Sequence, residues 1–205
     1  MKLYNGLSPN GARVGIFLAE KQIEVPTIEI DVMKGETQTP AYLKINSLGQ
    51  VPVLELDDGT VIAESVAICR YLESLHAEPA LFGDDAKAQA QIEMWNRRIE
   101  RHIFDTVGNV GMHEMPFFAN HIEQMPEYAK SLRRRFIEKL SWLDAELSDG
   151  RPFVAGEAFS VADITGMAAF MICHFIKQEV PADVANAKKW EQRLRTRPSW
   201  PTLPG

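Results

Sequence analysis

Cysteine is scarce in this sequence, whose 205 residues include only Cys69 and Cys173, far apart along the chain. Two separated thiols do not build the disulfide framework that stabilises small secreted domains. The first residues also lack the apolar core and cleavage site of a signal peptide. These absences favour a reducing compartment, and we expect the protein to be cytoplasmic.

Long apolar runs and blocks of one charge are missing as well. No stretch of 18 residues is apolar enough for a membrane helix, so no membrane partner is expected. The net charge is −6, and the one basic run, Arg133-Arg134-Arg135, lies in a helical pattern and is interpreted as a solvated face. Nucleic acid is not an expected partner either, because binding it needs a clustered basic surface.

Metal-ligand patterns are also missing. His102, His113 and His121 lack the spacing of metal ligands, and no carboxylate cluster joins them, so no metal site is predicted. The composition, 45% apolar and 24% charged, is that of an ordinary soluble globular protein. The length allows one large domain or two small ones.

The first 76 residues alternate strand and helix patterns. Asp57-Asp58-Gly59 predicts a hairpin turn, because glycine accepts positive φ. The other elements follow from apolar residues at helical or alternating spacing. The expected order is a strand at 2–5, a helix at 10–22, a strand at 27–32, a short helix at 41–45, hairpin strands at 53–56 and 60–62, and a helix at 65–76. This β-α-β-α-β-β-α order predicts an α/β domain over residues 1–76.

The rest of the chain has helical patterns. Residues 77–85 have the composition of a linker, and Asp85 is expected to cap the next helix. Residues 86–205 are expected to form an all-α domain. Its predicted helices are 86–122 with an interruption near Gly108 and Gly111, 127–147, one that opens at Ser160, and 182–196, which Pro198 ends.

Gln50-Val51-Pro52 stands just before the hairpin. A proline at the start of a strand has no backbone N–H to donate to the hydrogen bonds of a sheet, so it belongs at an edge or a bend. A cis Val51–Pro52 bond would turn the backbone N–H and C=O of Val51 outward, where they can pair with an extended peptide as an added strand does. The alternative is an ordinary trans proline, the commoner state of such bonds.

Glu64-Ser65 stands at the start of the 65–76 helix. With Ser65 as the expected N-cap, this helix end has free N–H groups and a positive pole, which bind a carboxylate. Glu64 adds an acceptor for an ammonium group. The pair therefore fits an amino-acid head group, and the alternative is a plain helix cap.

Ser8-Pro9-Asn10 lies at the junction of the first strand and helix. The positive helix end would stabilise a thiolate there, and a hydrogen bond from the Ser8 hydroxyl would favour the ionised form. The alternative is structural, with Ser8 as N-cap and Pro9 in the first helical position. A fourth motif, Ser160-Val161-Ala162-Asp163, fits a capping box and is interpreted as structural.

Taken in order, these motifs resemble the cytosolic glutathione S-transferases. The element order, Val51-Pro52, Glu64-Ser65 and a serine at the first strand–helix junction match the thioredoxin-like N-terminal domain of that family. The Ser160–Asp163 box, Trp190 and Arg195-Thr196-Arg197-Pro198 match its helical C-terminal domain, so the resemblance covers essentially the whole chain. Ser8-Pro9-Asn10-Gly11 is also similar to the Thr-Pro-Asn motif of bacterial nu-class and yeast-prion-like members.

The resemblance implies a role for each matching residue. Ser8 would stabilise the thiolate of glutathione, with Asn10 as the second candidate. The glutathione-binding residues so implied are Gln50, Val51 and Pro52 for the peptide backbone, Glu64 and Ser65 for the γ-glutamyl group, and Lys34 or Thr39 for the glycine carboxylate.

The implied reaction uses glutathione as co-substrate, without a metal. Its thiol, with a pKa near 8.5 like that of cysteine, would be activated as a thiolate that attacks a small apolar electrophile. Candidate residues for the electrophile pocket of the helical domain are Met112, Met115, Phe117 and Phe118. Core packing or a dimer contact are equally good interpretations of these four side chains. The resemblance also implies a homodimer.

Two other functions stay open. The same machinery could reduce a disulfide or hydroperoxide with glutathione, or the protein could be a non-catalytic glutathione-binding or interaction module, since fold and site do not prove turnover. The Ser8–Gly11 turn holds no cysteine, so cysteine-type chemistry and a Cys-x-x-Cys dithiol are not expected. Tyr4 and Cys69 are interpreted as packing residues.

Overall fold

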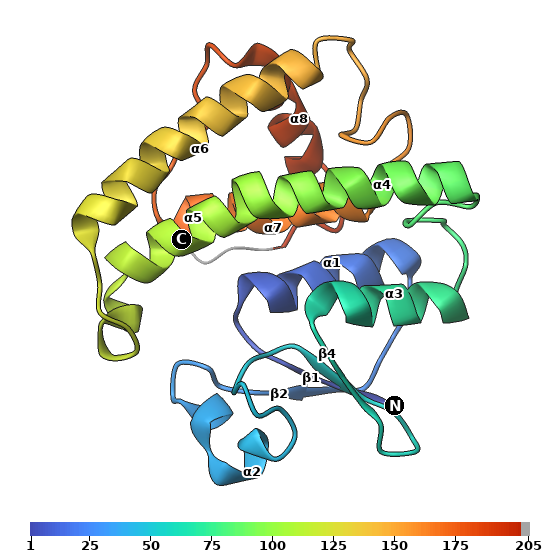
Figure 1. Cartoon of the computed structure of the whole chain (residues 1–205). Coiled ribbons are helices and arrows are strands. Elements are labelled where there is room, and N and C mark those ends of the chain that lie inside the picture. Colours follow the sequence, from blue (N-terminus) through green and yellow to red (C-terminus); the bar gives the residue numbers. More distant parts are fainter. Residues whose placement is uncertain (202–205) are drawn as a thin grey trace. The chain divides into compact units, whose positions relative to one another are not determined.

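A four-stranded sheet with the strand order β2-β1-β3-β4 organises the N-terminal part of the molecule (Figure 1). The computed structural model describes residues 1–201 and divides the chain into two units between Ala80 and Leu81, inside the predicted linker. Residues 202–205 of the predicted C-terminal domain lie outside the described residues. β1 (Lys2–Asn5) pairs in parallel with β2 (Thr27–Glu29) and antiparallel with β3 (Val53–Glu55), which pairs antiparallel with β4 (Val61–Ala63).

Helices lie on both faces of this sheet. α1 (Pro9–Lys21) and α3 (Ser65–Leu75) lie side by side on one face, and α2 (Pro40–Leu43) lies on the other after the 3-10 turn η1 (Glu36–Gln38) (Figure 1). Because strand side chains alternate, the paired Leu3 and Leu54 point to one face and the paired Tyr4 and Val53 to the other. The predicted thioredoxin-like α/β domain is thereby confirmed.

Tyr4, Tyr42, Val51 and Val53 form the buried cluster on the α2 side of the sheet. The rings of Tyr4 and Tyr42 meet edge to face at 6.3 Å, and the Tyr4 hydroxyl donates to Glu55 at 2.8 Å. Tyr4 is therefore a packing residue, as predicted.

The strand expected at 27–32 is shorter than the alternating pattern predicts. It ends at Glu29, because the chain turns at Asp31, whose carboxylate accepts from the Lys34 N–H at 3.0 Å. Ile30 lies beyond the strand bounds but still donates its backbone N–H to the Asn5 carbonyl of β1 at 2.7 Å. Ile30 and Val32 both pack against the α2-side cluster, so their alternation reflects burial against it.

The C-terminal unit is helical throughout, which confirms the predicted all-α domain. None of the helices described within residues 1–201 has both the length and the hydropathy to cross a bilayer. The helices are α4 (Ala86–Ile99), the π-helical turn η2 (Glu100–Phe104), α5 (Asp105–Glu114), the 3-10 turn η3 (Pro116–Asn120), α6 (Pro126–Glu146), α7 (Val161–Phe175) and α8 (Ala185–Arg195).

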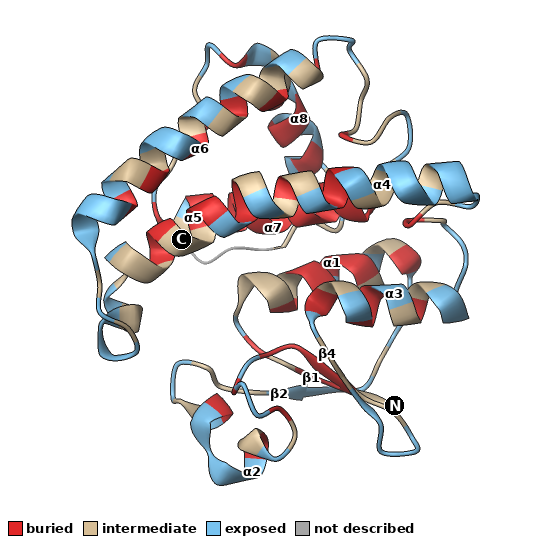
Figure 2. Cartoon of the chain, viewed as in Figure 1, coloured by how far each residue is buried: buried red, intermediate tan, exposed pale blue. Residues whose placement is uncertain are grey.

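α7 is the core of this unit. Every residue from Val161 to Cys173 is buried, and Figure 2 shows the visible part of the helix in red. The predicted capping box is present, and the buried Asp163 carboxylate accepts from the backbone N–H groups of Ser160 and Val154 and from Trp190 Nε1. Burial raises the pKa of Asp163, whereas these donors act in the opposite direction.

The interruption in the 86–122 pattern lies elsewhere than predicted. The helix changes to π geometry at η2, where the Asp105 N–H bonds to the Glu100 C=O, while Gly108 and Gly111 continue the regular α5. A Cβ added at either glycine would lie 3.9 Å from the side chain of Ile172 in α7. Both glycines therefore lie within α5 beside α7, and neither breaks the helix.

Candidate active site

A small pocket opens in the N-terminal unit, and both α1 and α3 begin beside it. Figure 1 shows the two helices running in the same direction with their first turns adjacent. Each helix N-terminus has a partial positive charge, so the pocket suits an anionic group. Its lining residues are Asn10, Asn46, Gln50, Val51, Pro52, Glu64 and Ser65.

The Val51–Pro52 bond is cis in the structure, the state that the peptide-binding hypothesis required. Val51 precedes β3 and lines the pocket. Neither its backbone N–H nor its C=O bonds to another protein group within residues 1–201. An extended peptide in the pocket can therefore pair with both groups.

Three side chains hold the loop that ends at Val51. Tyr42 Oη and Asn46 Nδ2 both donate to the carbonyl oxygen of Gln50, each at 2.9 Å. Gln38 Nε2 donates to the Gly49 carbonyl at 3.1 Å. Burial raises the pKa of Tyr42 to about 12, so its phenol remains a proton donor at neutral pH. The position of Val51 is thus set by the hydrogen bonds of these three side chains to the loop carbonyls.

The start of α3 differs from the expected Ser65 cap. Glu64 is the N-cap residue, with φ of 69° and no side-chain hydrogen bond to the first turn. Ser65 is the first helical residue, and its hydroxyl is buried among α1 side chains instead. The first N–H groups of α3 therefore have no side-chain cap and are available to a bound carboxylate.

Ser65 is tied to α1 by two hydrogen bonds. Arg13 Nη1 donates to Ser65 Oγ at 2.8 Å, and Ser65 Oγ donates to Asn10 Oδ1 at 3.2 Å. Arg13 Nη1 also lies 3.3 Å from Asn10 Oδ1, and the Arg13 residue is only 2% exposed. These contacts occupy the oxygen of the Asn10 amide, while its Nδ2 donates to no protein group within residues 1–201. Asn10 can therefore donate to a ligand in the pocket.

Ser8 is the N-cap residue of α1, which was the structural alternative for this position. Its Oγ accepts from the Gly11 N–H at 2.8 Å, and Pro9 occupies the first turn of α1. The hydroxyl proton remains free for another acceptor. Gly11 is required here, because an added Cβ would lie 2.6 Å from the backbone carbonyl oxygen of Gly6.

The predicted residues for the glycine carboxylate do not line the pocket. Lys34 pairs with Asp31 at 2.9 Å, and its side chain is 79% exposed. Thr39 caps α2 by accepting from the Tyr42 N–H at 3.3 Å. Their assignment remains a prediction.

Sequence reasoning missed three residues of this site: Arg13, Tyr42 and Asn46. Asn46 was recognisable only as part of the Asn-Ser-Leu-Gly turn, which is typical of loops. The site roles of Arg13 and Tyr42 depend on contacts with other elements, so no local pattern indicates them.

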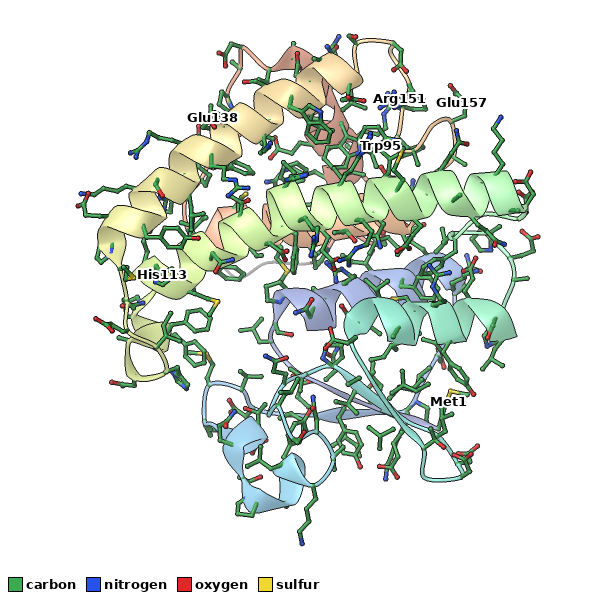
Figure 3. All side chains as sticks on the ribbon, in the orientation of Figure 1. Met1, Trp95, His113, Glu138, Arg151 and Glu157 are labelled. Atoms are coloured by element: carbon green, nitrogen blue, oxygen red, sulfur yellow. The ribbon has the colours of Figure 1, made fainter. Side chains whose placement is uncertain are left out.

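Four apolar residues of the C-terminal unit were predicted to line a second pocket. All four are half-buried and lie at the end of α5 and in η3, near the His113 that Figure 3 labels. The rings of Phe117 and Phe118 meet edge to face at 4.9 Å. Gln124 Nε2 donates to the carbonyls of Met112 and Met115, both at 2.9 Å. These contacts order the segment, and its pocket role remains a prediction.

Neither cysteine can act in the pocket. Cys69 is 0% and Cys173 2% exposed, and burial raises the pKa of each thiol to about 12. Cys69 is therefore the structural thiol that the sequence indicated. No group of three or more potential metal-binding side chains of His, Cys, Asp or Glu occurs in the part of the chain that the structure describes.

A thioredoxin-like unit with a cis-proline pocket, followed by an all-α unit, defines the class of protein. Two family models match the chain: "Glutathione S-transferase, N-terminal domain" over residues 7–75 and "Glutathione S-transferase, C-terminal domain" over residues 109–198. Glutathione S-transferase 2 of Saccharomyces cerevisiae is 37% identical over 195 residues, which are 93% of this chain and 83% of the relative.

Solved structures agree with these matches. The crystal structure of Gtt2 from Saccharomyces cerevisiae is similar at a TM-score of 0.88 and 36% identity, over 97% of this chain and 98% of that one. A glutathione S-transferase domain-containing protein from Marinobacter aquaeolei VT8 has a TM-score of 0.90 and 35% identity, over 98% of this chain and 100% of that one. The chain therefore belongs to the glutathione S-transferase family.

Both cysteines are expected to be unreactive in the folded protein, because thiolates are the reactive form and both thiols are buried. At about pH 8, dithionitrobenzoate should modify neither thiol rapidly, and unfolding in guanidinium should expose both. Ser8→Cys is the control, since it places a thiol at the positive end of α1 and should add one fast-reacting group. Rapid modification of the unaltered folded protein would contradict the burial described above.

Proposed function

We propose that the protein activates the thiol of glutathione as a thiolate in the pocket of its N-terminal unit and transfers it to a small apolar electrophile. Family membership supports the transferase reaction. The observation that carries the proposal is the convergence of Gln50, Val51, Pro52, Glu64 and Ser65 on one pocket with Asn10.

Two features of the pocket are complementary to the peptide part of glutathione. The free backbone N–H and C=O of Val51 would pair with the extended cysteinyl residue, as in strand addition. The uncapped first turn of α3 would receive the γ-glutamyl carboxylate, and the exposed Glu64 carboxylate would accept from its ammonium group. The ligand would thus be fixed at two points before its sulfur reacts.

The sulfur would lie near the first turn of α1. There the helix pole favours negative charge, the Ser8 hydroxyl has a free proton, and Asn10 Nδ2 is an available donor. Each hydrogen bond to the thiolate favours ionisation, and a shift of one pKa unit corresponds to about 1.4 kcal/mol. The thiol proton leaves to solvent, and the sulfur lone pair forms the bond to the electrophilic carbon. At the same time a leaving group departs with the electrons of its bond to that carbon, or the π bond of an activated double bond opens and its electrons take up a proton.

Arg13 is a positioning residue in this account. Its guanidinium holds the oxygen of the Asn10 amide, which directs the NH₂ of that amide away from Arg13. It also donates to Ser65, so one buried cation orders the first turns of both helices. The positive charge of Arg13 adds to the field that favours a thiolate.

Lys34 or Thr39 is proposed for the glycine carboxylate, which would require a change in their present contacts. Met112, Met115, Phe117 and Phe118 are proposed to supply adaptable apolar surface for the electrophile. Reduction of a disulfide or hydroperoxide by the same thiolate is the second candidate activity. The similarity of Ser8-Pro9-Asn10 to the Thr-Pro-Asn motif supports this activity, and both protein thiols are too buried to take part.

Glu64→Gln is expected to weaken glutathione binding by about tenfold, because it removes a charge-assisted hydrogen bond worth about 1.5–3 kcal/mol. Isothermal titration calorimetry measures the affinity, and conjugation of glutathione to a chloronitrobenzene measures turnover. Glu29→Gln is the matched control, since Glu29 is an exposed acid on β2 outside the pocket. If Glu64→Gln and Glu29→Gln bind glutathione with equal affinity, Glu64 is not part of the site. Binding of glutathione without turnover of any electrophile, disulfide or hydroperoxide would favour a binding module.

The protein is also proposed to be a cytoplasmic homodimer, as the family resemblance implies. Leu48, between α2 and β3, is 67% exposed, and Val61 on the edge strand β4 is 41% exposed, so the N-terminal unit presents apolar surface that a second copy could cover. Sedimentation equilibrium should give twice the 23.1 kDa chain mass, and Leu48→Ser should shift the equilibrium toward monomer. A monomeric mass for the unaltered protein at micromolar concentration would contradict the dimer.

A further inference from the structure

The chain between α5 and α6 buries none of its side chains. Within the described range 112–128 every residue is exposed or half-buried, although this range carries the four side chains proposed for the electrophile surface. Figure 1 shows the chain here looping beyond the ends of both helices. A segment without buried side chains is held in one place by few contacts, so its order depends on individual hydrogen bonds. We call residues 115–125 the α5–α6 segment.

Pro116 ends α5 and leaves a carbonyl group without its helical donor. In a continuing helix the Met112 carbonyl would accept from the backbone N–H of residue 116, and proline has none. Gln124 supplies a donor from the far end of the segment, because its Nε2 donates to the carbonyls of Met112 and Met115, both at 2.9 Å. The amide NH₂ has two hydrogens, so one side chain can serve both carbonyls. Gln124 therefore closes the segment onto the last turn of α5.

Contacts within the segment extend this attachment to its aromatic side chains. The Phe118 N–H donates to the Met115 carbonyl at 3.0 Å, so the carbonyl that Gln124 holds also begins the next turn. The rings of Phe117 and Phe118 then meet edge to face at 4.9 Å. The Met115 side chain lies against α5, because a Cβ added at Gly111 would be 3.4 Å from its Sδ. The position of both rings therefore depends on the Gln124 amide.

Other contacts keep α5 and α6 together without Gln124. The Met125 N–H donates to His113 Nδ1 at 3.2 Å, which attaches the end of the segment to α5. Arg133 of α6 forms two hydrogen bonds to Glu114 of α5. Loss of the Gln124 amide would therefore loosen the turn that carries the two phenylalanines and leave the helices in place.

We propose that Gln124 is a positioning residue for the second substrate, an inference that rests on the proposed function of Phe117 and Phe118 as electrophile surface. Gln124 touches neither glutathione nor the electrophile in this account. It holds the two rings in one arrangement before a ligand arrives, so an apolar group binds without the entropy cost of ordering the segment. Gln124 thereby determines how well the protein accepts an electrophile with a large apolar group relative to a small one.

Two isothiocyanates with the same reacting group test this proposal, benzyl isothiocyanate with an apolar ring and methyl isothiocyanate without one. In both, the glutathione sulfur forms a bond to the central carbon, the C=N π bond opens, and the nitrogen takes up a proton. Gln124→Leu should raise the KM for benzyl isothiocyanate by about fivefold, because the segment loses two hydrogen bonds. The kcat and the KM values for glutathione and methyl isothiocyanate should change by less than about twofold.

Gln192→Leu is the matched control, since Gln192 is an exposed glutamine on α8, and it should leave every value unchanged. Phe117→Ala with Phe118→Ala removes the rings through which Gln124 acts. Adding Gln124→Leu to that variant should therefore have no further effect on the KM for benzyl isothiocyanate. A uniform loss of activity toward both isothiocyanates would show a merely structural role for Gln124 and overturn the proposal.

The ring variant separates the two proposals. If it raises the KM for benzyl isothiocyanate and Gln124→Leu does not, the inference about Gln124 is wrong and the electrophile surface stands. If the ring variant leaves that KM unchanged, the electrophile surface is wrong, and the role of Gln124 fails with it.

Amide hydrogen exchange tests the attachment of the segment without turnover. Gln124→Leu should speed exchange at Phe118 and His121, whose N–H groups donate within the segment, and leave the core helix α7 unchanged. Unchanged exchange within the segment overturns the proposal, whether or not either isothiocyanate is conjugated. Gln124→Glu keeps the size of the side chain and loses the donor, so it replaces Gln124→Leu if thermal unfolding shows that the latter is not folded.

Discussion

The hydrogen bonds among Asn10, Arg13 and Ser65 are the constraint on which the candidate site depends. They join the first turns of α1 and α3, so two positive helix ends face one pocket. The buried guanidinium needs these hydrogen-bond acceptors, since a buried donor that loses its partner is destabilising. The same contacts orient the Asn10 amide and leave the first turn of α3 without a side-chain cap. One network thus provides both the peptide-binding end and the sulfur-binding end of the proposed site.

The loop before the hairpin also supports the candidate site, independently of the Asn10, Arg13 and Ser65 hydrogen bonds. Tyr42 and Asn46 hold the Gln50 carbonyl, and the cis Val51–Pro52 bond follows immediately. Tyr42 itself packs in the buried cluster on the α2 side of the sheet. The core of the domain therefore determines where the Val51 backbone lies in the pocket, and α2 thereby supports the proposed binding of a peptide ligand.

The sequence predicted much of the N-terminal unit, because strand alternation, helix spacing and the Asp57-Asp58-Gly59 turn are local patterns. It also predicted Gln50, Val51, Glu64 and Ser65 as a set, although only the resemblance to a family joined them. The positive φ of Glu64 and the use of the Ser65 hydroxyl by α1 were not predictable, since both depend on long-range packing. Arg13 was missed for the same reason.

The C-terminal unit shows the same limit of local patterns. The sequence predicted its helical character and the Ser160–Asp163 capping box, but it did not predict the boundaries of two helices. α8 begins at Ala185 because Asp144 of α6 accepts from the N–H groups of Asn186 and Ala187 at 2.6 Å and 3.1 Å. The π-helical η2 replaces the expected glycine break. At α8 a neighbouring element, and not the local sequence, determines where the helix begins.

The central claim is that the first turn of α1 stabilises the thiolate of bound glutathione. The most direct measurement is the ultraviolet thiolate absorbance of bound glutathione against pH, for the unaltered protein, Ser8→Ala and Asn10→Ala. The account predicts a thiol pKa below about 8.5 in the unaltered protein and a higher pKa in at least one variant that still binds glutathione. Bound glutathione with an unshifted thiol pKa in the unaltered protein would contradict it.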